Sequence, residues 1–188
     1  MELFDAIFSR RSTKLLSEPA PSREEVDRIL KAAVQGPDHL QLRPWRFVVL
    51  AGQAKEDFSR LSVERLVQRE PDATRGKIEK ESSKLARAPM VIVVGTKRLE
   101  AKIPFEELYA ATCAAIENLL LAATALGYGS MWRTGPSVHD EWTKQTLGFD
   151  KEDSIVGFIY LGSVQGNAAP VRSVESTEKT TWWQPPPA

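Results

Sequence analysis

The segment from Pro89 to Gly95, PMVIVVG, places the tightest limit on how this chain can fold. The run is apolar and rich in β-branched residues, and it lacks the alternating polar positions of a strand with one wetted face. This pattern predicts a strand that is covered on both sides. The rest of the chain must then supply helices that cover a central sheet.

Helical and strand patterns surround this segment in a regular order. Ser22, followed by two glutamates, is typical of a helix N-cap, and Gly36-Pro37 is typical of a helix end. The expected helices are 3–8, 22 to about 36, 54–70, 75–86, 105–126 and 136–147, and the expected strands are 47–50, 89–95, 127–133 (with its turn) and 155–161. This order of elements predicts an α+β or α/β domain with a helix-covered sheet.

The segment from Phe105 to Leu126 is the longest expected helix, and it is rich in Ala and Leu along its whole length. A helix that is apolar nearly all round lies either in the core or at a subunit interface, and the pattern leaves both open. Cys113 lies inside this helix, where we expect a buried and inert thiol.

Composition excludes several classes of function. The 25 basic and 25 acidic residues balance, which disfavours a broad nucleic-acid footprint or a membrane-surface patch. A single cysteine cannot form an internal disulfide, and no run approaches the roughly 18 apolar residues of a membrane span. The first residues do not resemble a signal peptide. We therefore expect a cytoplasmic protein that binds neither nucleic acid nor membrane.

Familiar chemical motifs are missing from the sequence. No glycine-rich loop ends in Lys-Ser/Thr, and Gly127-Tyr-Gly129 has no third glycine at the dinucleotide spacing. The two histidines and one cysteine do not make a typical zinc site, so we expect no metal.

Three polar groups of residues stand next to apolar elements. They are Arg10-Arg11-Ser12, then Asp38, His39, Gln41 and Arg43, and then Trp132-Arg133-Thr134. Arginine guanidinium groups and hydroxyls are suitable donors to a phosphate monoester. Each group alone also has a structural explanation, as a helix C-terminal charge, a loop cap or a surface ion pair.

The composition changes after Gly162, where four prolines and the pair Trp182-Trp183 occur in the last 26 residues. Prolines imply an extended backbone, and two tryptophans gain by burial. The pattern favours a tail that lies across a neighbouring surface, with a second subunit as one candidate, and a free chain end is the alternative.

Four segments in this order resemble the FMN-dependent nitroreductase family, in particular its short bacterial branch. They are RRSTKLLSEPAPS (10–22), ILKAAVQGPDHLQLRPWRFVVL (29–50), LGYGSMWRTG (126–135) and DSIVGFIYLGSVQ (153–165). The resemblance implies an α+β nitroreductase-like fold, in which helices flank a central mixed or antiparallel sheet. It also implies an intertwined homodimer with FMN at the subunit interface. The FMN-binding domain would span residues 1–165, and residues 166–188 would form the tail.

The resemblance implies a set of FMN-binding positions, shared between the two subunits, and no catalytic side chain, because the chemistry takes place at the flavin N5. These positions are Arg10, Arg11, Ser12, Gln35, His39, Met131, Trp132 and Arg133. Gln41 and Arg43 depart from the wider family pattern, and Arg172 in the tail is a weaker candidate for a phosphate contact.

The resemblance implies an NAD(P)H oxidoreductase that reduces nitroaromatic or quinone-like acceptors by ping-pong hydride transfer, with NADH or NADPH as co-substrate. Two alternatives stay open. The chain would bind FMN as a sensor or carrier without turnover, or it would be a non-flavin interaction module that binds a partner through its Trp182-Trp183 tail.

Overall fold

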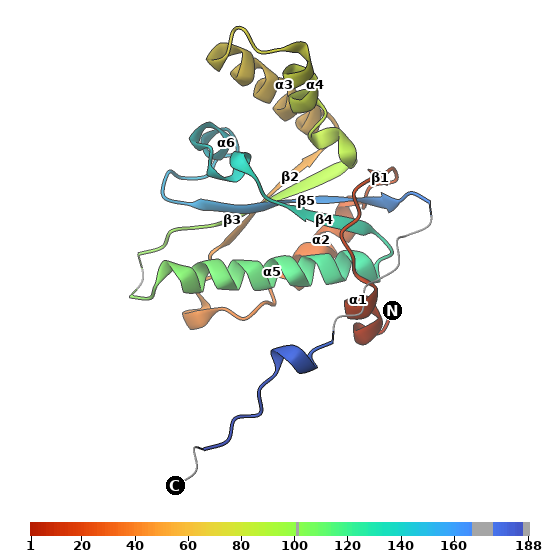
Figure 1. Cartoon of the computed structure of the whole chain (residues 1–188), viewed down its shortest axis with the longest axis vertical. Helices are drawn as coiled ribbons and strands as arrows, with labels where there is room; N and C mark the ends of the chain where they lie inside the picture. The colour runs from red at the N-terminus through yellow and green to blue at the C-terminus, as the bar shows by residue number, and fades with distance from the viewer. Residues whose placement is uncertain (101, 167–174, 186–188) are drawn as a thin grey trace.

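The computed structural model describes residues 1–100, 102–166 and 175–185, and it has helices on both faces of a central sheet (Figure 1). The α-helices are α1 (Leu3–Ser9), α2 (Arg23–Ala33), α3 (Gly52–Arg69), α4 (Arg75–Ser82), α5 (Phe105–Ala125) and α6 (Glu141–Thr146). The strands are β1 (Leu16–Ser17), β2 (Trp45–Ala51), β3 (Met90–Thr96), β4 (Gly129–Arg133) and β5 (Ser154–Val164). Short 3-10 turns are η1 (His39–Gln41), η2 (Leu85–Arg87), η3 (Pro136–His139) and η4 (Thr177–Lys179).

The sheet is antiparallel in each strand pairing that the described residues form. Its order is β1-β5-β3-β2, and β4 also pairs with β5. Strand β5 is the longest, and it pairs with β3, β4 and β1. Helices that surround an antiparallel sheet make this an α+β fold, which confirms one of the two classes that the order of elements allowed.

Strand β3 separates two hydrophobic layers, as the apolar run predicts. All seven of its residues are buried. Because successive side chains point to opposite faces, Ile92 and Val94 pack in the layer of α2 and α5, whereas Val91 and Val93 pack in the layer of α3 and α6. Figure 1 shows α2 and α5 below the sheet and the α3–α4 hairpin above it.

Helix α5 is the core helix of the lower layer. Its buried residues, from Leu108 to Ala123, follow a helical stripe, and Ala115, Ile116 and Leu119 are fully buried against the sheet. By length and composition alone this helix would pass as a membrane span, although no uninterrupted run of 18 apolar residues occurs. Because it is buried against the sheet and α2, α5 is a core helix of this fold.

Two expected helices had wrong boundaries and one short strand was missed, each for a local reason. The expected helix 136–147 is divided at Asp140, whose extended backbone interrupts it while its carboxylate caps α6 by accepting the Thr143 N–H at 2.9 Å. The expected helix 75–86 ends at Ser82 and continues as the separate turn η2. Strand β1 has only two residues, too few for a sequence pattern to reveal.

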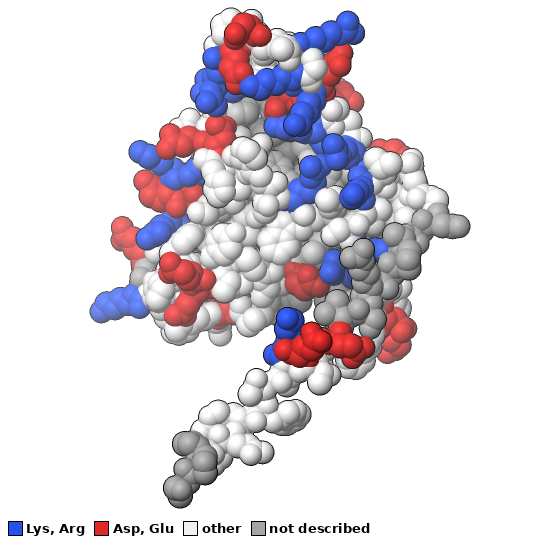
Figure 2. Space-filling view, in the orientation of Figure 1, with Lys and Arg blue, Asp and Glu red and all other residues white. Residues whose placement is uncertain are grey.

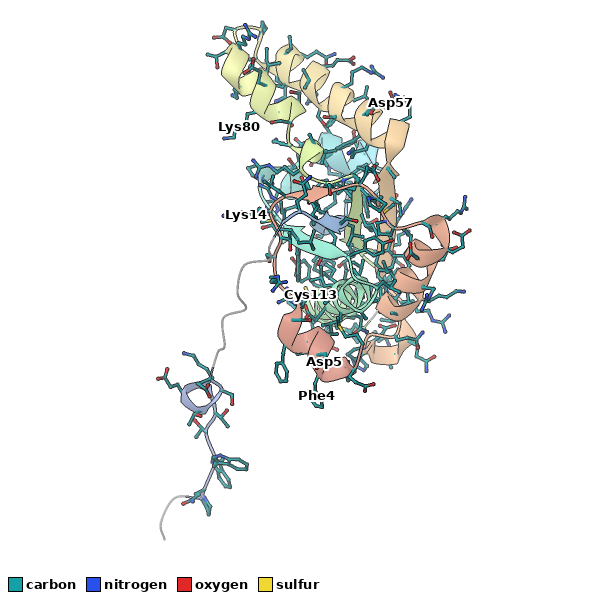
Figure 3. All side chains as sticks on the ribbon, turned by 90° about the vertical axis from the view of Figure 1, so that its right-hand side faces the viewer. Phe4, Asp5, Lys14, Asp57, Lys80 and Cys113 are labelled. Carbon is teal, nitrogen blue, oxygen red and sulfur yellow. The ribbon has the colours of Figure 1, made fainter. Side chains whose placement is uncertain are left out.

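The apolar face of α1 points away from the core. Leu3, Phe4 and Phe8 are each more than 60 % exposed, and Ala6 is the residue of α1 that is buried. The rings of Phe4 and Phe8 stack with centroids 5.9 Å apart, and Figure 3 shows Phe4 directed outward from the body. This helix therefore presents an apolar surface that the described residues do not cover.

The described part of the tail, residues 175–185, is exposed and runs away from the body (Figure 1). Trp182 and Trp183 are 89 % and 79 % exposed, so the described residues leave both side chains almost uncovered. Residues 167–174, which include Arg172, lie outside the described residues.

Candidate functional site

The segment after α1 is fixed to the edge of β4. Ser12 forms an isolated parallel bridge with Ser130, and the Thr13 N–H donates to the Ser130 carbonyl at 2.9 Å. This contact joins two of the polar groups that the sequence keeps about 120 residues apart. Arg10, Ser12 and Trp132 consequently lie around one hollow.

We call this hollow the strand-edge cavity. It has a volume of about 310 Å³ and is lined by Arg10, Ser12, Glu117, Leu120, Ser130, Trp132 and Thr134. The Arg10 Nε lies 3.2 Å from the Glu117 Oε1, which ties the arginine to α5. Hydroxyls and one guanidinium thus surround a space with a tryptophan in its wall.

Ser130 gives the strand-edge cavity an unused hydrogen-bonding group. Its side chain is 2 % exposed, and its Oγ has no hydrogen-bond partner among the described residues. A buried hydroxyl without a partner costs on the order of 1–3 kcal/mol. A ligand or water in this cavity would remove that penalty.

Trp132 is held in place by strand β5. Its Nε1–H donates to the Val156 carbonyl at 3.3 Å, and its ring packs against the α5 layer. Gly157 makes this possible, because a Cβ at that position would lie 2.2 Å from the Trp132 Nε1. The tryptophan therefore has a fixed position in the cavity wall.

A second hollow lies on the opposite face of the sheet, between the α3–α4 hairpin and strands β4 and β5. This hairpin cleft has a volume of about 370 Å³, and both cavities include Thr134 in their lining. Arg133 belongs to it, because successive residues of β4 point to opposite faces. Figure 2 shows Lys and Arg side chains around the hollow below the hairpin.

Arg133 and Tyr160 form the sheet wall of the hairpin cleft. The Arg133 guanidinium carbon lies 5.5 Å from the centroid of the Tyr160 ring, and the Tyr160 hydroxyl donates to the Lys84 carbonyl at 3.1 Å. Burial raises the pKa of Tyr160, and the nearby Arg133 and Arg87 charges partly oppose that rise. Tyr160 is therefore a neutral donor at physiological pH.

The eight expected FMN positions do not all meet in one protomer. Arg10, Ser12 and Trp132 line the strand-edge cavity, Arg133 lines the hairpin cleft, and Met131 packs in the layer of α3 and α6. Arg11, which follows Arg10 in the sequence, is half-buried.

Gln35 and His39 lie elsewhere. The Gln35 Nε2 donates to the Lys31 carbonyl at 3.3 Å, and the His39 Nδ1 pairs with the Glu107 carboxylate of α5. Glu107 and Glu117 are ten residues apart on that helix, so the His39 and Arg10 anchors are separated by about 15 Å along its axis.

The loop that carries His39 has an unusual backbone. Leu40, Gln41 and Arg43 have φ values of 60°, 53° and 51°, a conformation that non-glycine residues rarely adopt. The Asp38 Oδ2 accepts the Arg43 N–H at 2.6 Å, which closes the loop on itself. The other carboxylate oxygen, Oδ1, is buried and has no hydrogen-bond partner among the described residues. Such backbone strain, of order 1–3 kcal/mol per residue, clusters at binding sites.

Sequence reasoning missed Ser130 and Glu117 as cavity residues. Ser130 lies in the segment LGYGSMWRTG, two positions before Trp132. Residues two apart on a strand share a face, so this spacing could have indicated that Ser130 lines the same cavity as Trp132. Glu117 had no such signal, because one acid in an Ala- and Leu-rich helix resembles a solvated position. Among the described residues, no group of three or more His, Cys, Asp or Glu side chains is arranged to hold a metal ion.

Comparison with known proteins identifies the class to which this geometry belongs. Residues 7–163 match the model of the Nitroreductase family. The protein named "Putative NAD(P)H nitroreductase YdjA" from Escherichia coli (strain K12) is 34% identical over 171 residues, which cover 90% of this chain and 92% of that protein. The chain belongs to the Nitroreductase family.

Solved structures show the same fold. The nitroreductase-like family protein from Bacillus cereus superposes with a TM-score of 0.81 at 22% identity, covering 97% of this chain and 96% of that one. A nitroreductase with bound FMN from Bacteroides fragilis NCTC 9343 superposes with a TM-score of 0.73 at 21% identity, covering 97% and 99%. The α+β nitroreductase-like fold implied by the resemblance is confirmed.

Proposed function

We propose that this chain is an FMN-dependent NAD(P)H oxidoreductase that reduces nitroaromatic or quinone-like acceptors. The observation that carries the proposal is the strand-edge cavity, where Arg10, Ser12 and the unpartnered hydroxyl of Ser130 converge in a member of the Nitroreductase family. The names of its relatives support the same activity, because they include NAD(P)H nitroreductases and a structure with bound FMN.

The residues of the strand-edge cavity fit the parts of an FMN molecule. Arg10, with Arg11 and Ser12 beside it, would donate to the phosphate. Glu117 would accept from ribityl hydroxyls, and its charge is matched by its ion pair with Arg10. Trp132 supplies a flat apolar surface for the ring system. Hydroxyl donors, a guanidinium and an aromatic wall are the groups that this cofactor requires.

The chain itself supplies binding and electrostatics, and the bound flavin would supply the hydride chemistry at its N5. Arg10, in the wall of the strand-edge cavity, would place a positive charge beside the flavin, whereas Arg133 lies on the other face of β4. A nicotinamide and then an acceptor would use the same space in turn, which is a ping-pong order. Nothing in this scheme requires an acid or base from the protein.

A homodimer would complete the site. His39 pairs with Glu107, about 15 Å along α5 from the Glu117 that pairs with Arg10, which is too far to serve the same flavin ring from one protomer. The exposed apolar face of α1, beside α5, is a surface that a second copy would cover. The pair Trp182-Trp183, which the described residues leave almost uncovered, would extend this contact.

The proposal is tested by titrating the full chain with FMN and following the flavin absorbance near ~450 nm. Arg10→Ala should weaken FMN binding about tenfold or more, the loss expected for a charge-assisted hydrogen bond. Arg75→Ala is the matched control, since Arg75 also pairs with a glutamate but lies exposed on α4. A chain that takes up no FMN would refute the proposal.

Turnover distinguishes the enzyme from the sensor or carrier alternative. The flavin-loaded protein is mixed anaerobically with NADH or NADPH and then with nitroaromatic and quinone acceptors. Bleaching followed by reoxidation supports the enzyme, whereas stable FMN binding without bleaching by either nucleotide supports a carrier. If deletion of residues 170–188 abolished binding of a protein partner by a folded chain that takes up no FMN, the interaction module would be favoured.

A further inference from the structure

The hairpin cleft has chemical features that FMN binding at the strand-edge cavity does not explain. It lies on the other face of β4, with helix α3 on one side and strands β4 and β5 on the other. A group bound there would be separated from the flavin ring by the sheet, so that group would neither donate nor accept hydride. The cleft is therefore a candidate for a second site that binds a ligand without reducing it.

The charges in the wall of the cleft leave two arginines without an acidic partner. Each acid in the wall is matched by a base: Asp140 pairs with Arg69, Glu81 with Lys84, and Glu70 with Lys77. In the described part of the chain, neither Arg65 nor Arg133 forms an ion pair. These two residues come from α3 and β4, on opposite sides of the cleft. The cleft consequently has unmatched positive charge from two guanidinium groups.

Arg65 is the more informative of these two residues. Arg65 is half-buried, and its Nε is buried without a hydrogen-bond partner among the described residues. A guanidinium donor left unpaired in such a place is costly, unlike an arginine that extends into water. A phosphate monoester carries a charge of about −2 at neutral pH and accepts guanidinium hydrogen bonds in pairs. One phosphate would therefore match the charges of both Arg65 and Arg133, whereas a carboxylate would leave one of them unmatched.

The remainder of the cleft suits a flat, uncharged ring that carries hydroxyl groups. Trp142 is half-buried and lines the cleft, and its ring stacks on the buried Phe58 with centroids 6.0 Å apart. Ser62, Thr134 and Ser137 add hydroxyl groups to the same lining. The volume of about 370 Å³ lies within the range of small-molecule sites, at its lower end. An aromatic wall, hydroxyls and two arginines are together complementary to a purine nucleoside that bears a phosphate.

We infer that the hairpin cleft is a second ligand site, which binds a phosphorylated purine nucleoside with its base on Trp142 and its phosphate on Arg65 and Arg133. No bond of the ligand is made or broken in the cleft. Two molecules carry this chemistry, a free adenosine monophosphate (AMP) and the adenosine 2′-phosphate end of NADPH. The second source rests on the proposed function. Its nicotinamide would reach the flavin around the end of β4, at Thr134, which lines both cavities.

The binding test is calorimetric titration of the full chain with 2′-AMP and with 5′-AMP, in the presence and absence of FMN. For the AMP that binds more tightly, Arg65→Gln should weaken binding about tenfold or more, because a charge-assisted hydrogen bond is lost. Arg65→Lys should retain part of the affinity. Arg60→Gln, on the exposed face of α3 where Arg60 pairs with Glu64, should leave the affinity unchanged. Trp142→Leu should weaken binding about tenfold through lost stacking of the base, and Trp142→Phe should retain most of it.

Adenosine and inorganic phosphate are the matched partial ligands, since each supplies one half of the proposed contacts. Each should bind about tenfold or more weakly than AMP. Three outcomes would overturn the inference. Inorganic phosphate that binds as tightly as AMP would show that the cleft attracts anions by charge alone. An AMP affinity that is the same in Arg65→Gln and in the original protein would exclude the phosphate contact, and displacement of bound FMN by AMP would place the nucleotide in the flavin site.

Titration with NADP⁺ and NAD⁺ distinguishes the two sources without any hydride transfer. Binding of NADP⁺ about tenfold tighter than that of NAD⁺, with an advantage that Arg65→Gln removes, would identify the end of NADPH. Equal binding of the two dinucleotides, by a chain that binds AMP through Arg65, would identify a free nucleotide. A chain that binds AMP through Arg65 but takes up no FMN would support this site and refute the proposed function. A chain that takes up FMN but binds none of these nucleotides in the cleft would refute the inference and leave the proposed function standing.

Discussion

Gly157 is the position where a single methyl group should disturb the proposed flavin site most directly. An alanine Cβ there would lie 2.2 Å from the Nε1 and 2.5 Å from the Cδ1 of Trp132, where ordinary contacts begin at 3.4 Å. The indole must therefore move by about 1 Å, since the Arg133 carbonyl at 3.1 Å restricts the other side. Because overpacking of a core typically costs about 1–3 kcal/mol, we expect Gly157→Ala to lower the free energy of unfolding by about 2 kcal/mol.

The assay is urea unfolding combined with FMN titration. Displacement of Trp132 should weaken FMN binding as well as stability, because this indole forms the wall of the strand-edge cavity. Gly76→Ala is a control of the same chemistry, since a Cβ at Gly76 on helix α4 meets nothing within 4 Å. That change should stabilise the protein by roughly 0.5–1 kcal/mol through helix propensity.

A double-mutant cycle shows whether the effect passes through Trp132. Trp132→Leu removes the ring that the new methyl group would meet, so Gly157→Ala should cost about 1–2 kcal/mol less in that background. If Gly157→Ala changed stability by less than about 0.5 kcal/mol and left FMN affinity intact, the fixed position of Trp132 would be wrong.

Two further predictions concern titratable groups. The backbone N–H of Ser22 and the Tyr128 hydroxyl hold the pKa of Glu25 below its ordinary value of 4.5, so this stabilisation is present above that pH and is lost as pH falls through the lowered pKa. Unfolding free energies of Glu25→Gln and the original protein, measured by urea titration, should therefore converge on acidification; a constant difference would contradict this. Burial raises the pKa of the Cys113 thiol, so iodoacetamide at pH 8 should modify it more slowly in the folded protein than in urea, and equal rates would refute this.

The sequence predicted the elements that packing determines. Strand β3 and helix α5 were located correctly because each has a long apolar pattern: that of β3 predicts a two-sided sheet position, and that of α5 allowed a core helix or an interface helix, of which the fold shows the core helix. The division of 136–147 was missed because Asp140 acts through a local cap, which a hydrophobic pattern does not register.

The candidate site was less predictable than the fold. Arg10, Ser12 and Trp132 were found through the family resemblance, and their meeting depends on the bridge between Ser12 and Ser130, which joins distant parts of the chain. Cys113 was expected to be buried but is half-buried, because it lies beside the buried stripe of α5 (Figure 3).

The spacing of Glu107 and Glu117 on α5, which pair with His39 and Arg10, predicts a specific geometry for the proposed dimer. Glu107 pairs with His39 and Glu117 pairs with Arg10, and the midpoint between these acids is residue Thr112, next to Cys113. A twofold axis through this midpoint would place His39 of one subunit near the Arg10 anchor of the other, since a symmetric interface exchanges the two ends of the helix. The strained loop of His39 would then border the flavin of the neighbouring subunit, and that contact would account for the Asp38 Oδ1 that has no hydrogen-bond partner among the described residues.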